Sequence, residues 1–486
     1  MTHLLLMLLS GCASMDSHMA AGDAAGPGGA DLDADANQLR IDIIPGESTP
    51  FLDPQSWLVG EDEDLGSLAI DILPSITVRG QLVGYTATPY GAEVPGADET
   101  PVDGLVSMFR LGTIAGSSAS TEINGNFSLQ VPPSSGYQFS AIPAEGQVLP
   151  FLVEVDTAIE TETDLGIIDL GYGSPVYGRV TADNDEAVLG ASVQLQDAAS
   201  GVLGPRSMSD ENGHFILRAK PGEYMVVVSG MIGQAIPTIH TAIEVIEDES
   251  TEVNIELGSL NTATVYGQLF GPKLTTAQRD VRVRFSSSQL NGSEGSLEIE
   301  TETDGDGVFS RSLLSGTWTA ELIPPFDSDL APSQMTFTVN DDQSMVNLGE
   351  VPLPERINFR SVAMDPTGNP VAGVAVNARE LGFDGFIRST TTDAEGWFEL
   401  MLAPHPMALT LVPPGQSLAV THAMIDPVTD RGSVAMSRGE TVEGRITSRG
   451  IGVPFALLEI RDSTGLLYAT SLSDSDGYFS VRMEAF

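Results

Sequence analysis

Histidines, the side chains that serve most often as catalytic bases, are few and scattered in this chain. Six occur in 486 residues, without a zinc-binding His-Glu-x-x-His pair, a Gly-x-Ser-x-Gly turn or a phosphate-binding glycine loop. They are His3, His18, His214, His240, His405 and His422. A nucleophilic triad or a metal-dependent hydrolase needs such a grouping, so the sequence predicts a protein that is not an enzyme.

Aspartates alternate on two glycine turns, where they could bind a cation. Asp304 and Asp306 occupy one turn, and Asp474 and Asp476 occupy the other. Ca²⁺ prefers oxygen ligands of this kind, but a calcium loop also needs a later acidic ligand. The four residues after Gly307 contain none. We therefore interpret these aspartates as solvated turn carboxylates and predict no cofactor, with Ca²⁺ binding at these four residues as the alternative.

Exposed aromatic rings on one face would indicate a carbohydrate-binding surface. The chain contains three tryptophans, Trp57, Trp318 and Trp397. Trp318 opens a predicted strand at a place where other copies of a repeat have Tyr137 and Tyr224, so it is expected in a core. Trp57 and Trp397 remain as candidate binding residues, but they lie in different repeats and predict no shared platform.

The only cysteine, Cys12, follows an apolar run at residues 4–9 and the small residues Ser10 and Gly11. This run is far shorter than the ~20 residues that span a bilayer. The segment resembles the lipobox of bacterial lipoproteins, in which the cysteine carries the lipid anchor. The resemblance implies a signal peptide over 1–11 and lipidation of Cys12. Because Ala13 follows the cysteine, it also implies an outer-membrane lipoprotein that is periplasmic or exposed at the surface.

Composition excludes one class of partner and favours one class of fold. The net charge is −45, with 22 basic and 67 acidic residues, which argues against nucleic-acid binding. Hydrophobic residues make up 41%, enough for packed cores. The 51 glycines and 30 prolines indicate a turn-rich β protein.

A turn motif recurs five times and indicates how the chain is organised. Each copy has Asp or Asn near a glycine and a phenylalanine two residues later, which is typical of a hairpin turn followed by an inward-facing residue. The glycines are Gly125, Gly213, Gly307, Gly396 and Gly477. A Val-x-Gly marker precedes four of the turns, at residues 78–80, 176–178, 265–267 and 442–444, with a degenerate copy at 359–361. Alternating apolar and polar residues between the markers predict half-buried strands.

The order of these markers resembles the carboxypeptidase regulatory-like or transthyretin-like domain family, which is related to the B-type repeats of bacterial surface adhesins. The resemblance is clearest for residues 174–259. It implies an all-β chain of tandem seven-stranded Greek-key sandwiches of the Ig-like, prealbumin-like kind. No part of the chain resembles the catalytic domain of a carboxypeptidase.

The repeats divide the chain into segments. A flexible tether is predicted over 12–38, and β-sandwich repeats over 74–173, 174–259, 260–354 and 355–440, the last of them degenerate. Residues 39–73 match only the second half of a repeat, and residues 441–486 only the first half. One interpretation is an incomplete chain, or N-terminal strands that pack on the first full domain. The other is head-to-tail self-association, in which the leading half of one chain completes the trailing half of another.

These observations predict a non-enzymatic, lipid-anchored cell-envelope protein. Short junctions between repeats favour a semi-rigid stalk for scaffolding or adhesion. Its partners would be the membrane, through Cys12, and an unidentified protein or glycan. The alternatives are a carbohydrate-binding surface protein and a calcium-stabilised adhesin.

Overall fold

The computed structural model describes residues 39–46, 49, 52–59, 65–85, 99–110, 112–231, 234–381, 383–385, 387–430, 432–462 and 465–484. Within these ranges the regular structure is β, apart from three short 3₁₀ turns at Asp183–Asp185, Pro272–Leu274 and Phe383–Gly385. The all-β prediction is confirmed. None of the described helices has the length and apolar character needed to cross a membrane.

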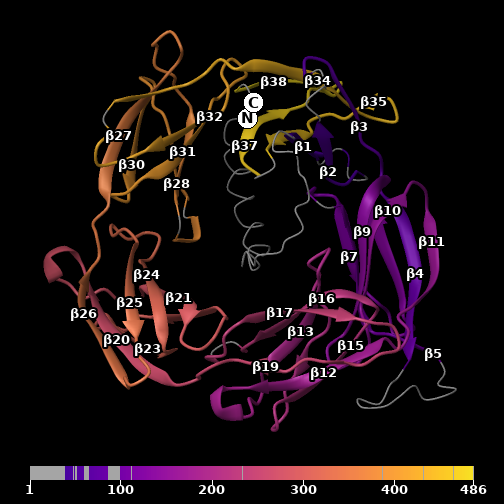
Figure 1. The fold of residues 1–486 in the computed structure, drawn as a ribbon. Helices are drawn as coiled ribbons and strands as arrows, with labels where there is room; N and C mark the ends of the chain where they lie inside the picture. Colours follow the sequence, from indigo (N-terminus) through magenta and orange to yellow (C-terminus); the bar gives the residue numbers. More distant parts are fainter. Residues whose placement is uncertain are drawn as a thin grey trace.

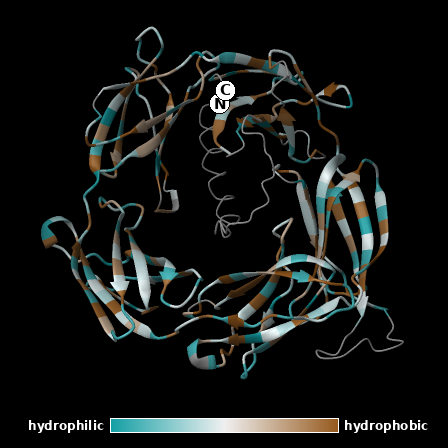
Figure 2. Cartoon of the chain, viewed as in Figure 1, coloured by the Kyte–Doolittle hydropathy of each residue, from teal (hydrophilic) through white to brown (hydrophobic). Residues whose placement is uncertain are grey.

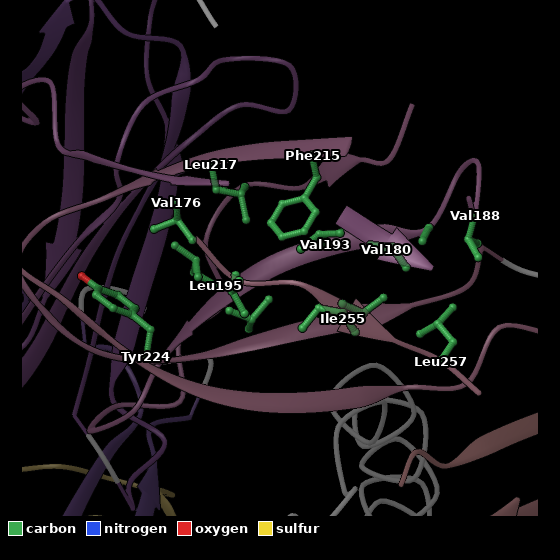
Figure 3. Close-up of a cluster of buried hydrophobic side chains, with 14 of the residues drawn as sticks. Val176, Val180, Val188, Val193, Leu195, Phe215, Leu217, Tyr224, Ile255 and Leu257 are labelled. Carbon is green, nitrogen blue, oxygen red and sulfur yellow. The ribbon is translucent and has the colours of Figure 1, made fainter. Parts of the chain in front are cut away.

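The second sandwich shows the plan most clearly. Its strands are β12 (Ser174–Thr181), β13 (Ser192–Asp197), β14 (Ser207–Met208), β15 (His214–Ala219), β16 (Gly222–Ser229), β17 (Ile239–Val245), β18 (Thr251–Glu252) and β19 (Ile255–Glu256). One sheet has the order β14-β13-β16-β17, and in the other β12 pairs antiparallel with β15 and parallel with β18 and β19. Buried residues alternate along β12, and along β16 from Tyr224 onward. Figure 3 shows core side chains of this sandwich, among them Val176, Val180 and Tyr224, between the two sheets.

Three further sandwiches repeat this plan. The first has β4 (Ile76–Tyr85), β5 (Glu99–Pro101), β6 (Gly104–Arg110), β7 (Gly116–Ser120), β8 (Asn126–Val131), β9 (Ser134–Pro143), β10 (Leu152–Ile159) and β11 (Thr163–Asp169). The third has β20 (Thr262–Phe270), β21 (Arg282–Leu290), β22 (Leu297–Glu302), β23 (Val308–Leu314), β24 (Gly316–Ile323), β25 (Ser333–Val339) and β26 (Met345–Pro352). The fourth has β27 (Ile357–Met364), β28 (Ala375–Glu380), β29 (Ile387–Thr391), β30 (Trp397–Leu402), β31 (Met407–Val412), β32 (Thr421–Ile425) and β33 (Ser433–Ala435).

A fifth sandwich, here called the closure sandwich, combines the two partial segments. The segment over 39–73 supplies β1 (Leu39–Ile44), β2 (Gln55–Val59) and β3 (Leu68–Asp71). The segment from 440 onward supplies β34 (Glu440–Ser448), β35 (Ile451–Gly452), β36 (Leu457–Arg461), β37 (Leu467–Leu472) and β38 (Tyr478–Met483). One sheet has the order β2-β1-β36-β37, and in the other β34 pairs parallel with β3 and antiparallel with β38.

The five sandwiches therefore form a closed ring, as Figure 1 shows. The predicted semi-rigid stalk is wrong in shape, because pairing of β1 with β36 and of β3 with β34 joins the two ends of the row. The sheet of β13, β14, β16 and β17 and its counterparts in the other sandwiches lie on the inner side of the ring, and the sheet of β12 and its counterparts lie outside (Figure 1). Figure 2 shows brown and teal residues alternating along the strands, as expected when one face of each sheet is buried.

Candidate functional site

The two sequence markers of the repeat lie opposite each other across one pair of strands. The glycine of Val-x-Gly is the register partner of the phenylalanine after the turn, as in Gly80 with Phe127 and Gly267 with Phe309. A Cβ at Gly80 would lie 2.8 Å from the Phe127 ring, so the ring packs where the glycine has no side chain. In the degenerate fourth copy Ser361 replaces the glycine, and its hydroxyl donates to the Gly432 carbonyl over 2.7 Å.

The four candidate aspartates for calcium divide into two kinds. One oxygen of Asp304 accepts the backbone N–H groups of Asp306 and Val308, each over 2.9 Å. Asp474 makes the same bonds to Asp476 and Tyr478. These first aspartates stabilise their own turns, while Asp306 and Asp476 are exposed. Among the described residues, no three His, Cys, Asp or Glu side chains form a group that could hold a metal ion.

The same carboxylate bond occurs in turns that lack a second aspartate. Asp210 accepts the backbone N–H groups of Asn212 and His214, each over 2.8 Å. The bond from His214 is the main reason why the pKa of Asp210 lies below its usual value. The first aspartate accepts the same backbone hydrogen bonds whether or not a second aspartate follows it. These bonds therefore stabilise the hairpin turn and do not indicate a cation site.

A buried hydroxyl beside each turn is a feature that sequence reasoning missed. Ser209 donates to the Val188 carbonyl over 2.6 Å and accepts the Ala191 N–H over 2.9 Å. The equivalent Ser473 donates to Val453 and accepts from Ala456. The hydroxyls of Thr121, Thr303 and Thr392 make the same pair of bonds. Serine or threonine at the first position of all five turns was the available signal.

The two candidate tryptophans lie on different sandwiches and different sheets. Trp57, on β2, is half-buried against the core of the closure sandwich and lines a cavity of about 110 Å³ next to Arg110 and Tyr137. Trp397, on β30, is 39% exposed, and the Arg360 guanidinium lies 4.6 Å from its ring centre. The structure does not bring the two rings together. Of the two, Trp397 is the exposed one.

Large aromatic side chains near the start of β9, β16 and β24 serve the cores. Trp318 is fully buried, and its indole N–H donates to the Leu314 carbonyl over 2.8 Å. The Tyr137 hydroxyl donates to Pro132 over 2.6 Å, and that of Tyr224 to Lys220 over 3.0 Å. Burial raises the pKa of both tyrosines to about 12.

The four described histidines lie apart and take part in local contacts. His214 is exposed beside Asp210, His240 is exposed on β17, and the His405 ring lies tilted against that of Phe383, with 5.8 Å between the ring centres. His422 lies where the fourth sandwich meets the closure sandwich, and its Nε2 is 2.7 Å from the Leu467 carbonyl oxygen. Cys12, the signal peptide and the predicted tether lie outside the described residues, as do His3 and His18.

The closure sandwich contains a polar network that joins three parts of the chain. Asp42, only 2% exposed, accepts the Ser56 hydroxyl over 2.6 Å and forms a 3.0 Å ion pair with Arg40. Arg461, from the C-terminal segment, lies 3.9 Å from the same carboxylate. The Ser56 hydroxyl in turn accepts the backbone N–H of Ile114 in the first sandwich over 3.0 Å. Asp42 thus ties both halves of the closure sandwich to their neighbour.

An open groove of about 620 Å³ lies on the other side of the closure sandwich. It runs over β34 and β38 towards Gln416 of the fourth sandwich, and Asp474 and Tyr478 line it. The Arg445 guanidinium lies 5.0 Å from the Tyr478 ring centre, and its Nε donates to the Asp476 carbonyl. The groove therefore lies beside one of the two turns that carry candidate aspartates.

Comparison with known proteins identifies one repeat. The family model of the carboxypeptidase regulatory-like domain matches residues 175–258, which are the second sandwich, and confirms the resemblance seen in the sequence. None of the curated proteins matches the chain.

Several solved structures match the chain at low similarity. A streptococcal ancillary pilin is 12% identical over 58% of this chain and 99% of its own, with a TM-score of 0.25. The Bacillus anthracis TIE protein is 12% identical over 80% of this chain and 76% of its own, with a TM-score of 0.18. BcpA, the major pilin subunit of Bacillus cereus, is 13% identical over 55% of this chain and 99% of its own, with a TM-score of 0.16.

Proposed function

We propose that this protein is a non-enzymatic, lipid-anchored protein of the cell envelope, in which a closed ring of Ig-like modules acts as a scaffold for adhesion or assembly. The proposal rests on the structural role of the polar and aromatic side chains. In the described turns and junctions they hold modules in place, and they do not converge on a reaction centre. Such an arrangement favours a body that presents loops to a partner.

Contacts at the junctions favour a stiff scaffold. Phe151, from the first sandwich, lies in the core of the second, with its ring centre 5.9 Å from that of Tyr224. Thr238 of the second sandwich and Ser296 of the third exchange two backbone hydrogen bonds of 2.6 and 3.0 Å. The Arg388 side chain of the fourth sandwich donates to the Phe326 carbonyl of the third. Buried and paired contacts of this kind restrict hinge motion between neighbours.

The shape can be tested by small-angle X-ray scattering of the soluble chain from residue 39 onward. A closed ring of five sandwiches is expected to give a compact particle with a maximum dimension well below that of five modules in a row. A distance distribution with the long tail of a rod would contradict the scaffold proposed here.

Anchoring through Cys12 is tested by changing that residue in the full chain. Cys12→Ser is expected to move the protein from the membrane fraction to the soluble fraction, since the thioether to the lipid cannot form. Met15→Ser, a substitution nearby in the same segment, serves as the control and should stay with the membrane. Membrane retention of Cys12→Ser would refute lipid anchoring.

Carbohydrate binding is the alternative that a specific observation favours, because Trp397 is exposed over Arg360. Tyr478 over Arg445 is its counterpart in the closure sandwich and provides a matched control. A glycan array and a protein pull-down with the chain from residue 39 separate the two kinds of partner. Glycan binding lost in Trp397→Ala and kept in Tyr478→Ala would support the alternative; binding of proteins alone would support the scaffold.

A calcium-stabilised adhesin, the other alternative, requires Ca²⁺ binding at the two turns that carry two aspartates. Adding Ca²⁺ to chelator-treated protein is expected to leave its Tm unchanged, since Asp304 and Asp474 already bond to their own backbones. A rise in Tm that Asp306→Asn and Asp476→Asn abolish would instead support a calcium-stabilised adhesin.

A further inference from the structure

The closure sandwich is built from two segments that lie far apart in the sequence. Its described core contains eight buried residues from the N-terminal arm, here defined as residues 39–73, and ten from the segment after residue 440. The eight are Leu39, Ile41, Ile43, Leu52, Val59, Leu68, Ile70 and Ile72. Neither segment can bury its apolar face without the other.

The pairing between the two segments is fully specified by register. β1 runs antiparallel to β36, with Ile41 opposite Ile460, and β3 runs parallel to β34, with Ile70 opposite Ile446. Without the arm, β36 and β34 would each expose an edge with free N–H and C=O groups. That exposed half is an acceptor whose shape, hydrogen bonds and apolar pattern match one segment, the arm.

The arm is joined to the rest of the ring by a short connection. β3 ends at Asp71 and β4 begins at Ile76, with Pro74 between them. Because Ile72 is still buried in the closure core and the backbone of Leu73 bonds to the Gln55 side chain on β2, only Pro74 and Ser75 remain to act as a hinge. A short hinge beside a segment that pairs as a unit favours domain swapping, in which two copies of a protein exchange the same segment.

We propose that a second copy of this chain can supply the arm, so that β1–β3 of one molecule complete β34–β38 of another. Every contact between the two segments of the closure sandwich, including that between Asp42 and Arg461, is available to an arm from either source. Within one chain, the arm binds its partner strands at an effective concentration that the connecting chain sets and that does not change with the protein concentration. Between two chains, the same binding depends on the protein concentration. Head-to-tail exchange therefore increases with concentration and after refolding of concentrated protein.

Cross-linking across the β1–β36 register distinguishes the two arrangements. Ile44 lies opposite Leu457 at the end of the paired region, both are only half-buried, and neither belongs to the Asp42 network. In the full chain with Cys12→Ser, the double variant Ile44→Cys/Leu457→Cys is expected to form a disulfide within one molecule. Failure of this cross-link would show that the register is not formed and would overturn the proposal.

The decisive experiment mixes two single variants, Ile44→Cys and Leu457→Cys, each in the Cys12→Ser chain. The mixture is unfolded, refolded at increasing concentration and oxidised, and disulfide dimers are measured on a non-reducing gel. Several-fold more dimer is expected than from Ile44→Cys mixed with Glu256→Cys, an exposed position on β19 that records random collisions. A yield equal to that control at every concentration would overturn the proposal.

Discussion

The second sandwich and the closure sandwich have the same strand plan but differ in how the chain supplies it. In the second, residues 174–257 provide every strand and all of the described core except Phe151, which comes from the first sandwich. In the closure sandwich, β1–β3 come from the start of the described chain and β34–β38 from its end. Both nevertheless pair their outer strands in parallel, β12 with β18 and β34 with β3. The fold depends on strand register and core complementarity, and does not depend on chain continuity within the module.

Removing the N-terminal arm should have the largest effect, because only one of the two sandwiches depends on it. Deletion of residues 39–73 removes eight of the eighteen described core residues of the closure sandwich and is expected to abolish amide protection over 441–484. The second sandwich should keep its protection. Hydrogen exchange with mass spectrometry measures both regions in one sample, and retained protection over β34–β38 would contradict a shared core.

High pH should weaken the second sandwich through Tyr224 and weaken the closure sandwich less, because Tyr468, a tyrosine there whose pKa burial raises, is only partly buried. The raised pKa of Tyr224, about 12 against an ordinary 10.0, means that the folded state holds this proton more tightly than the unfolded state. Its contribution is complete below pH 10 and is lost as pH rises from 10 to about 12, at most about 3 kcal/mol. The closure sandwich has Leu39 at the aligned position.

This pH dependence is measured by urea unfolding of the second sandwich at several pH values. Tyr224→Phe keeps the ring without the titrating hydroxyl and should flatten the curve between pH 10 and 12. A wild-type curve as flat as that of the variant would show that Tyr224 titrates alike in both states.

Loss of the buried hydroxyl should cost the two sandwiches equal amounts. Ser209→Ala and Ser473→Ala each leave a carbonyl and an N–H group without their partner, which is expected to cost about 1–3 kcal/mol. Local unfolding free energies from hydrogen exchange provide the measurement. A much smaller cost for Ser473→Ala would show that the turn is less constrained where the strands come from separate segments.

A change of connectivity should have the smallest effect of all. In the four contiguous sandwiches, the connection equivalent to the gap from Met483 to Leu39 has one to four residues, such as Lys220 and Pro221 after β15. In a circular permutant, Pro-Gly links Met483 to Leu39, and the new ends lie between residues 259 and 260. Because the contacts between strands are unchanged, the permutant is expected to form the same ring and to have a Tm within about 2 °C of the wild-type value. Loss of β1–β36 protection in the permutant would contradict the topology.

The repeat was readable from the sequence because its markers have local causes. Gly213 and Phe215 recur at a fixed spacing, and the structure shows why, since the glycine adopts φ of +80° and the phenylalanine enters the core. The match of residues 39–45 to residues 137–143 likewise predicted that the arm is the second half of a repeat. The two halves belong to one module, and this follows from the strand pairing of β1 with β36.

Ring closure and the hydroxyl bonds could not be predicted in the same way. The curvature arises at the junctions from single contacts, such as Phe151 against Tyr224, and these have no period that a sequence scan can detect. Asp42 reads as an ordinary polar residue on a strand, and its burial depends on Arg461, which is more than four hundred residues away. The hydroxyl of Ser209 was visible in the motif, but its two partners lie in a preceding loop.

The closed path has a mechanical consequence for a molecule that is held at one point and pulled at another. In a linear row of domains, tension passes through each domain in series, so the weakest one yields first. Here a pull on Leu39 divides between two routes, one through β3 and the covalent connection to β4, the other through the β1–β36 hydrogen bonds into the fourth sandwich. Each route bears part of the load, and extension requires the closure sandwich to shear before the other four modules can be drawn out.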